Sequence, residues 1–156
     1  MVETAWKFGI MGRGEGDLRK GGGSMYEMKD EYLTGIGEID KEHAVLFEIA
    51  EEIYRLCENE FVPDKYDQIV NLVERLRQYT VMHFEHEEAY MERIGYKKMF
   101  TQKVQHENFK NKLEALDLES IDENQEQAIE DLLKFVTDWL VEHIMGTDKQ
   151  IGEFNG

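Results

Sequence analysis

Side chains that could bind a metal recur at helical spacing on otherwise apolar faces of this chain of 156 residues. His83 and Glu87 are four residues apart, as are Gln102 and His106, so each pair lies on one face of a predicted helix. Imidazole nitrogens together with carboxylate or amide oxygens are donor atoms that bind transition metals. The candidates on inward-facing stripes are His43, His83, Glu87, Gln102, His106 and His143.

A carboxylate on an apolar stripe needs a partner. An unpaired buried Glu87 would cost on the order of several kcal/mol or take up a proton. No Lys or Arg lies on the inward stripes to pair with it, and four of the five histidines point into the same predicted core. A metal ion bound by the carboxylate and by neutral imidazoles satisfies these groups better than four unrelated core histidines would.

Asp148 is a further candidate, five residues after His143. On an ideal helix it would be turned about 140° away from that histidine. Gly146 lies between them and could let the backbone bend so that the carboxylate turns inward. The alternative for Asp148 is an exposed residue near a helix end. His86, flanked by glutamates, is interpreted as a rim residue rather than a ligand.

The donor inventory exceeds what one tetrahedral zinc ion requires. Four histidines, two carboxylates and one glutamine fit two metal ions bridged by carboxylates better. The donors are nitrogen and oxygen and include no thiolate, so iron is the leading candidate metal and manganese the next. The single cysteine, Cys57, lies at the end of its predicted helix remote from His43 and is interpreted as a small core residue.

Four long helices must position these residues, and the apolar periodicity predicts them. Asp40 is the expected N-cap of the first, Pro63 separates the first two, and Gly95 ends the second. Short polar connections favour antiparallel neighbours, so the predicted fold is all-α, an antiparallel up-down-up-down four-helix bundle. The helices are expected at about residues 40–59, 64–95, 97–116 and 122–146.

The formal net charge is −16, from 34 acidic and 18 basic residues. This charge argues against nucleic-acid binding, which needs clustered Lys and Arg, and against an anionic membrane surface as partner. No stretch approaches the roughly 20 apolar residues of a membrane-spanning helix. A single cysteine excludes a disulfide framework and suits a reducing compartment, so a cytoplasmic location is expected.

The composition changes near Ser24. Residues 1–24 carry four basic and three acidic side chains and seven of the thirteen glycines, whereas the remainder carries a net charge of −17. This segment has no helical stripe, and its final Gly-Gly-Gly-Ser run is typical of a flexible linker. We expect an added tag or a disordered extension at residues 1–24, with a short docking peptide as the alternative. The four-helix bundle domain is expected at residues 25–156.

Several spaced motifs resemble those of the bacterial hemerythrins. Their order and spacing agree with the family over about residues 28–152, nearly all of the predicted helical part. The resemblance implies a non-heme diiron centre, with an oxo or hydroxo bridge, that binds dioxygen reversibly for storage, delivery or sensing. The motifs are the lead-in Thr34–His43, the run His83–Glu88, Gln102 and His106 followed by Phe109, the run Trp139–Ile144, and Asp148–Lys149.

The same resemblance implies a role for each candidate. Two carboxylates would bridge the two irons, and two pairs of histidines would complete them, one iron keeping a position for dioxygen. The bridging residues would be Glu87 and Asp148, the iron that binds dioxygen would have His43 and His83, and the other would have His106 and His143.

Gln102 departs from the family pattern, which has a histidine paired with His106 at this spacing. An amide oxygen is a weaker, neutral donor, and three outcomes are open. Gln102 ligates weakly, water takes the position, or that iron binds loosely or is absent. A second open position would favour peroxide turnover or iron oxidation, so a diiron oxidase or peroxidase-like enzyme is the alternative function. A metal-binding regulatory module is a third.

Overall fold

The computed structural model describes residues 25–154. Within that range the chain forms four long α-helices with short connections and no β-strand. A 3₁₀ turn precedes the first and the fourth long helix, and a π turn and a short helix follow the fourth. The elements in chain order are η1 (Asp30–Tyr32), α3 (Gly37–Glu58), α4 (Tyr66–Ile94), α5 (Met99–Glu114), η2 (Ser120–Glu123), α6 (Gln125–His143), η3 (Ile144–Asp148) and α7 (Lys149–Glu153).

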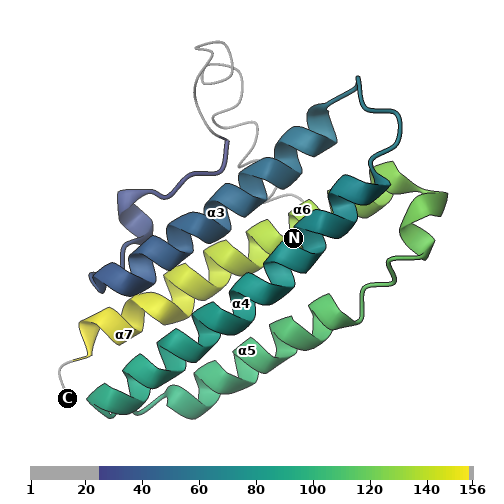
Figure 1. Ribbon diagram of the computed structural model, residues 1–156. Coiled ribbons are helices and arrows are strands. Elements are labelled where there is room, and N and C mark those ends of the chain that lie inside the picture. Colours follow the sequence, from purple (N-terminus) through teal and green to yellow (C-terminus); the bar gives the residue numbers. More distant parts are fainter. Residues whose placement is uncertain (1–24, 155–156) are drawn as a thin grey trace.

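The four long helices lie side by side in one bundle (Figure 1). Helix α3 contacts both α4 and α6, and α4 also contacts α5. In Figure 1 the chain runs along the bundle in alternating directions from each long helix to the next. The predicted all-α four-helix bundle is confirmed.

Local sequence signals end and start the helices. Pro63 lies in the connection between α3 and α4, outside both helices, where its missing N–H breaks no helical hydrogen bond. Gly95 follows α4 with φ of 69°, a left-handed conformation that glycine adopts easily, and its N–H donates to the carbonyl of Glu92. Asn124 caps α6, because its side chain accepts a hydrogen bond from the N–H of Gln127.

The start of α3 differs from the expectation. The predicted N-cap, Asp40, lies inside the helix, which begins at Gly37. The Asp40 carboxylate accepts hydrogen bonds from the N–H and the hydroxyl of Thr34 and from the N–H of Gly35. Asp40 therefore fixes the lead-in loop against the first turn of α3.

A continuous apolar core runs along the bundle between the helices. Each fully buried Leu, Ile, Val or Phe side chain stabilises the fold by roughly 1.5–3 kcal/mol relative to exposure. Near the start of α3 and the end of α6, buried polar side chains interrupt this core. Core residues with at most 1% exposure include Ala50, Ile53, Val73, Leu76, Phe84 and Val136.

The segment formed by η3 and α7 lies against the lead-in that precedes α3. A Cβ on Gly152 would lie 1.8 Å from the carbonyl oxygen of Thr34, so this approach requires glycine. The Lys149 ammonium donates to the carbonyl of Glu31 at 2.9 Å. Ile151 is buried in a small apolar cluster that also includes residues of α4. These contacts fix the position of the last residue of η3.

The predicted tag or extension at residues 1–24 lies outside the described residues, so this assignment and the domain boundary at residue 25 stay predictions. Between residues 25 and 154, no helix is both long enough and apolar enough to span a bilayer.

Candidate metal centre

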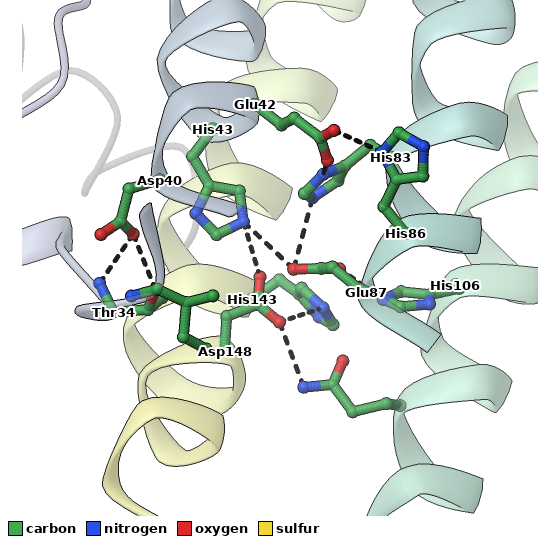
Figure 2. A network of polar contacts seen from close by, with 12 residues as sticks. Thr34, Asp40, Glu42, His43, His83, His86, Glu87, His106, His143 and Asp148 are labelled. Atoms are coloured by element: carbon green, nitrogen blue, oxygen red, sulfur yellow. Dashed lines mark hydrogen bonds and ion pairs between the residues drawn. The ribbon is translucent and has the colours of Figure 1, made fainter. Parts of the chain in front are cut away.

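The seven predicted metal ligands lie together in one buried cluster, most of which is drawn in Figure 2. Helices α4 and α5 supply two each, and α3, α6 and η3 supply one each. None of these side chains is more than 4% exposed. Their exposed fractions are 1% for His43, 1% for His83, 0% for Glu87, 0% for Gln102, 0% for His106, 4% for His143 and 0% for Asp148.

The Glu87 carboxylate lies between the imidazoles (Figure 2). Its Oε2 is 3.2 Å from Nε2 of His43 and 3.3 Å from Nε2 of His83. Its Oε1 is 3.1 Å from Nε2 of His106. One carboxylate therefore faces imidazoles from three helices, and each imidazole presents the same ring nitrogen.

Asp148 makes the second set of contacts. Its Oδ2 is 3.0 Å from Nε2 of His43, and its Oδ1 is 3.0 Å from Nε2 of His143. The side-chain amide of Gln102 donates to Oδ1 at 3.1 Å. Asp148 is thus part of the cluster, and the alternative of an exposed residue near a helix end is wrong.

A π turn, rather than a bend at Gly146, brings Asp148 to this position. In η3 the N–H of Lys149 donates to the carbonyl of Ile144, five residues earlier. Such a turn returns residue i+5 toward the side of residue i, so Asp148 lies beside His143. A Cβ on Gly146 would meet nothing within 4 Å, and its φ is not positive, so the turn does not require this glycine.

Six atoms of the cluster are buried without a hydrogen-bond partner among residues 25–154. Some of these atoms lie 3.0–3.1 Å from a polar atom of another cluster residue, but the angles of these contacts are not those of a hydrogen bond. Each unmet buried polar atom costs about 1–3 kcal/mol. A cation binds carboxylate, amide and imidazole lone pairs at once, so this donor set fits metal ions. The atoms are His43 Nδ1, Glu87 Oε1, Gln102 Oε1, His106 Nε2, His143 Nε2 and Asp148 Oδ2.

The candidate ligand atoms form two overlapping groups, in each of which the atoms lie within 4.8 Å of one another. Both carboxylates belong to both groups, and each group adds two different imidazoles. The arrangement could therefore hold two cations that share Glu87 and Asp148. One group is His43, His83, Glu87 and Asp148, and the other is Glu87, His106, His143 and Asp148.

Neighbouring opposite charges shift the pKa values of Glu87 and His83. Burial raises the pKa of Glu87, but the charge of His83 and the close approach of the other imidazoles outweigh it and hold that pKa well below its usual range. Burial lowers the pKa of His83, but Glu87 and Glu42 with Asp148 outweigh it and raise that pKa to about 10. Without a metal ion, at least one protonated imidazole balances the buried carboxylates. Metal binding must displace such protons, since a ligand nitrogen needs its lone pair.

Two cluster imidazoles each contact a further glutamate through Nδ1, the ring nitrogen that does not face Glu87. Glu42 Oε1 lies 2.8 Å from Nδ1 of His83, and Glu88 Oε2 lies 2.9 Å from Nδ1 of His106. Contacts of this kind fix the ring orientation and leave Nε2 directed at a cation. Neither glutamate is among the predicted residues. Each is the sequence neighbour of a predicted ligand, which is the signal that could have found it.

His86 lies at the rim of the cluster, as expected. Its side chain is 55% exposed, and its Nδ1 contacts the second oxygen of Glu42 (Figure 2). Glu42 therefore connects a buried imidazole to an exposed one.

Replacement of Glu42 by alanine is expected to weaken metal binding about 10–100-fold, because His83 loses the carboxylate that orients its ring. Calorimetric titration of the metal-free protein with Zn²⁺ measures the change. Glu48→Ala, on the exposed face of the same helix, is the matched control and should bind as the unchanged protein does. Equal affinities of the two variants would show that His83 does not depend on Glu42.

Aromatic rings pack on the imidazoles of α5 and α6. Phe84 stacks on His106, with ring centroids 4.0 Å apart and planes 4° apart. Trp139 stacks on His143 at 4.2 Å and 12°. Phe109 packs against both Phe84 and Trp139. These rings cover one side of the cluster with apolar surface.

Four long helices present four imidazoles and one carboxylate to one buried site, and η3 adds a second carboxylate, so the fold is that of a cation-binding helical bundle. The family model of the hemerythrin HHE cation binding domain matches residues 34–154. The chain is 44% identical over 126 residues to a bacteriohemerythrin of Clostridium acetobutylicum, covering 81% of this chain and 98% of the relative. It is 27% identical over 122 residues to a bacteriohemerythrin of Methylococcus capsulatus, covering 78% and 89%. The chain belongs to the hemerythrin family, and the resemblance to its bacterial members is confirmed.

Proposed function

We propose that this protein binds dioxygen reversibly at a non-heme diiron centre, for storage, delivery or sensing of oxygen. The observation that carries the proposal is the pair of overlapping cation groups that share Glu87 and Asp148. Membership of the hemerythrin family supports iron as the metal, as does a set of nitrogen and oxygen donors without thiolate. Two iron ions bound there would supply the electrons that dioxygen accepts on binding.

The chain's own residues have separate roles in this proposal. The shared carboxylates would hold both metal ions, and two imidazoles would complete the protein ligands of each ion. Glu42 and Glu88 orient one imidazole in each pair. The shared residues are Glu87 and Asp148, one pair of imidazoles is His43 and His83, and the other is His106 and His143.

Exclusion of water supports binding without turnover. The cluster residues are at most 4% exposed, and Phe84 and Trp139 cover two of the imidazoles with aromatic surface. An apolar enclosure limits the access of water and protons to bound dioxygen, so the reduced state should be recovered when dioxygen leaves.

Absorption spectroscopy of iron-loaded protein tests the proposal. The reduced protein should gain a near-ultraviolet and visible band on exposure to oxygen and lose it again when oxygen is removed. Oxygen uptake measured beside the spectrum should approach one molecule for each pair of iron ions. An iron-loaded protein that stays colourless in air would contradict reversible dioxygen binding.

Gln102 favours a second candidate function, a diiron oxidase or peroxidase-like enzyme. Where the resemblance implies a histidine, this chain has glutamine, a weaker neutral donor, which could leave a second position open to exchange. Steady-state consumption of hydrogen peroxide by the iron-loaded protein would support this alternative. Loss of that consumption in Gln102→His, together with reversible oxygen binding, would assign the difference to this residue.

A cytoplasmic location, and the expectation of neither nucleic-acid nor membrane partners, stay predictions from composition and charge.

A further inference from the structure

Gln102 has the two ends of its amide in different surroundings. The side chain is fully buried on α5, one turn before His106. Its Nε2 lies 3.1 Å from Oδ1 of Asp148. An ionised carboxylate only accepts hydrogen bonds, so the group that faces Asp148 is the amide NH₂ and not the amide oxygen. The carboxylate therefore sets the orientation of the amide.

The amide oxygen of Gln102 is the end that has no partner. This Oε1 atom is buried and accepts no hydrogen bond from residues 25–154. The neighbouring cation group already has four candidate ligands besides Gln102, namely His106 and His143 with the two shared carboxylates. A buried acceptor beside such a group can accept a hydrogen bond from a small ligand that has a donor.

We propose that Gln102 is a positioning residue: its amide N–H holds Asp148, and its oxygen accepts a hydrogen bond from a small protonated ligand, such as water or hydrogen peroxide, at the second cation position. This inference rests on the two-metal centre of the proposed function. Each cation position then has two imidazoles and the two shared carboxylates. Four protein donors and the expected oxo or hydroxo bridge would fill five of the six places of an octahedral ion, so each ion would keep one place for a small exogenous ligand.

Zinc titration of the metal-free full chain, followed by calorimetry, separates a positioning residue from a ligand. Asp148 belongs to both cation groups. Gln102→Leu should therefore weaken both binding steps, about 10–100-fold each, and leave two Zn²⁺ bound. A residue that ligates only the second ion would weaken one step and leave the other unchanged. Gln105→Leu, at a half-buried glutamine of the same helix, is the control and should change neither step.

Azide binding to the cobalt-loaded protein tests the second open position. The visible absorption of Co²⁺ changes with its coordination, so titration with azide counts the positions that accept an exogenous anion. The unchanged protein should bind two azide ions and Gln102→His only one, because the added imidazole would fill one position. Gln105→His adds the same imidazole outside the cluster and should still bind two.

Two results would overturn the inference: a single weakened step in Gln102→Leu, or a single azide ion on the unchanged protein. Thermal unfolding of the metal-free variants shows that each is folded, and Gln102→Met replaces Gln102→Leu if that variant is not. Neither titration uses iron or oxygen. Failure of the iron-loaded protein to bind dioxygen would remove the proposed function and leave these results intact, whereas fewer than two Zn²⁺ on the unchanged protein would overturn both.

Discussion

Glu87→Gln is expected to lower the affinity for metal ions more than about 100-fold at both cation positions. The two oxygens of Glu87 face imidazoles from three helices, and both cation groups include this residue. The replacement keeps the shape of the side chain and removes its charge. Loss of a partner that merely orients a ligand already costs about 10–100-fold in affinity, and loss of a shared ligand should cost more. Zinc calorimetry and the metal content of purified protein measure the effect.

Glu85→Gln is the matched control for this experiment. Glu85 lies exposed on the same helix, two residues before Glu87, and loses the same charge. Its metal content should equal that of the unchanged protein, and far-ultraviolet circular dichroism should show the same helix content in both variants. Equal losses in the two variants would mean that the acidic surface, and not the position of Glu87, governs metal binding.

Gly152→Ala is expected to destabilise the protein by about 1–3 kcal/mol and to weaken metal binding as well. The new Cβ would lie 1.8 Å from the carbonyl oxygen of Thr34 and 2.9 Å from its carbonyl carbon, both of which are backbone atoms. Helix α7 must then move away from the lead-in, and Asp148 at the end of η3 moves with it. Thermal unfolding with and without Zn²⁺ measures both effects, and the loss should be larger with metal.

Gly146→Ala is the control, because it makes the same replacement six residues earlier where a Cβ meets nothing within 4 Å. Its stability should stay within about 1 kcal/mol of the unchanged protein, and its zinc affinity should not change. If it is as harmful as Gly152→Ala, the contact with Thr34 is not the cause.

The inward positions could be predicted because residues four apart share a helix face whatever else the chain does. His83 with Glu87, and Gln102 with His106, therefore reach the same cluster. The two pairs are expected to meet at one site because the buried carboxylate of Glu87 needs a cation or a protonated group beside it. Periodicity and the cost of burying charge thus predict most of the fold and most of the cluster.

What the sequence could not predict depends on irregular backbone and on packing. An ideal helix turns Asp148 away from His143, and only the π turn of η3 brings it back, a feature that no residue pattern in that segment indicates. Glu42 contacts His83, 41 residues away, so its role depends on how α3 packs against α4. Asp40 was predicted as an N-cap by its type, but the contacts that it makes depend on the path of the lead-in loop.

The six buried atoms without hydrogen-bond partners make the metal-free bundle locally frustrated near the start of α3 and the end of α6. Because the donors come from every long helix, bound cations would cross-link the whole bundle. Ligands that bind only the folded state add stability in proportion to the logarithm of their concentration, about 2.7 kcal/mol at 100 times the dissociation constant. We therefore expect the lifetime of the folded chain to depend on metal supply. When metal is scarce, the folded population falls, and this part of the core is the first to open to exchange and proteolysis.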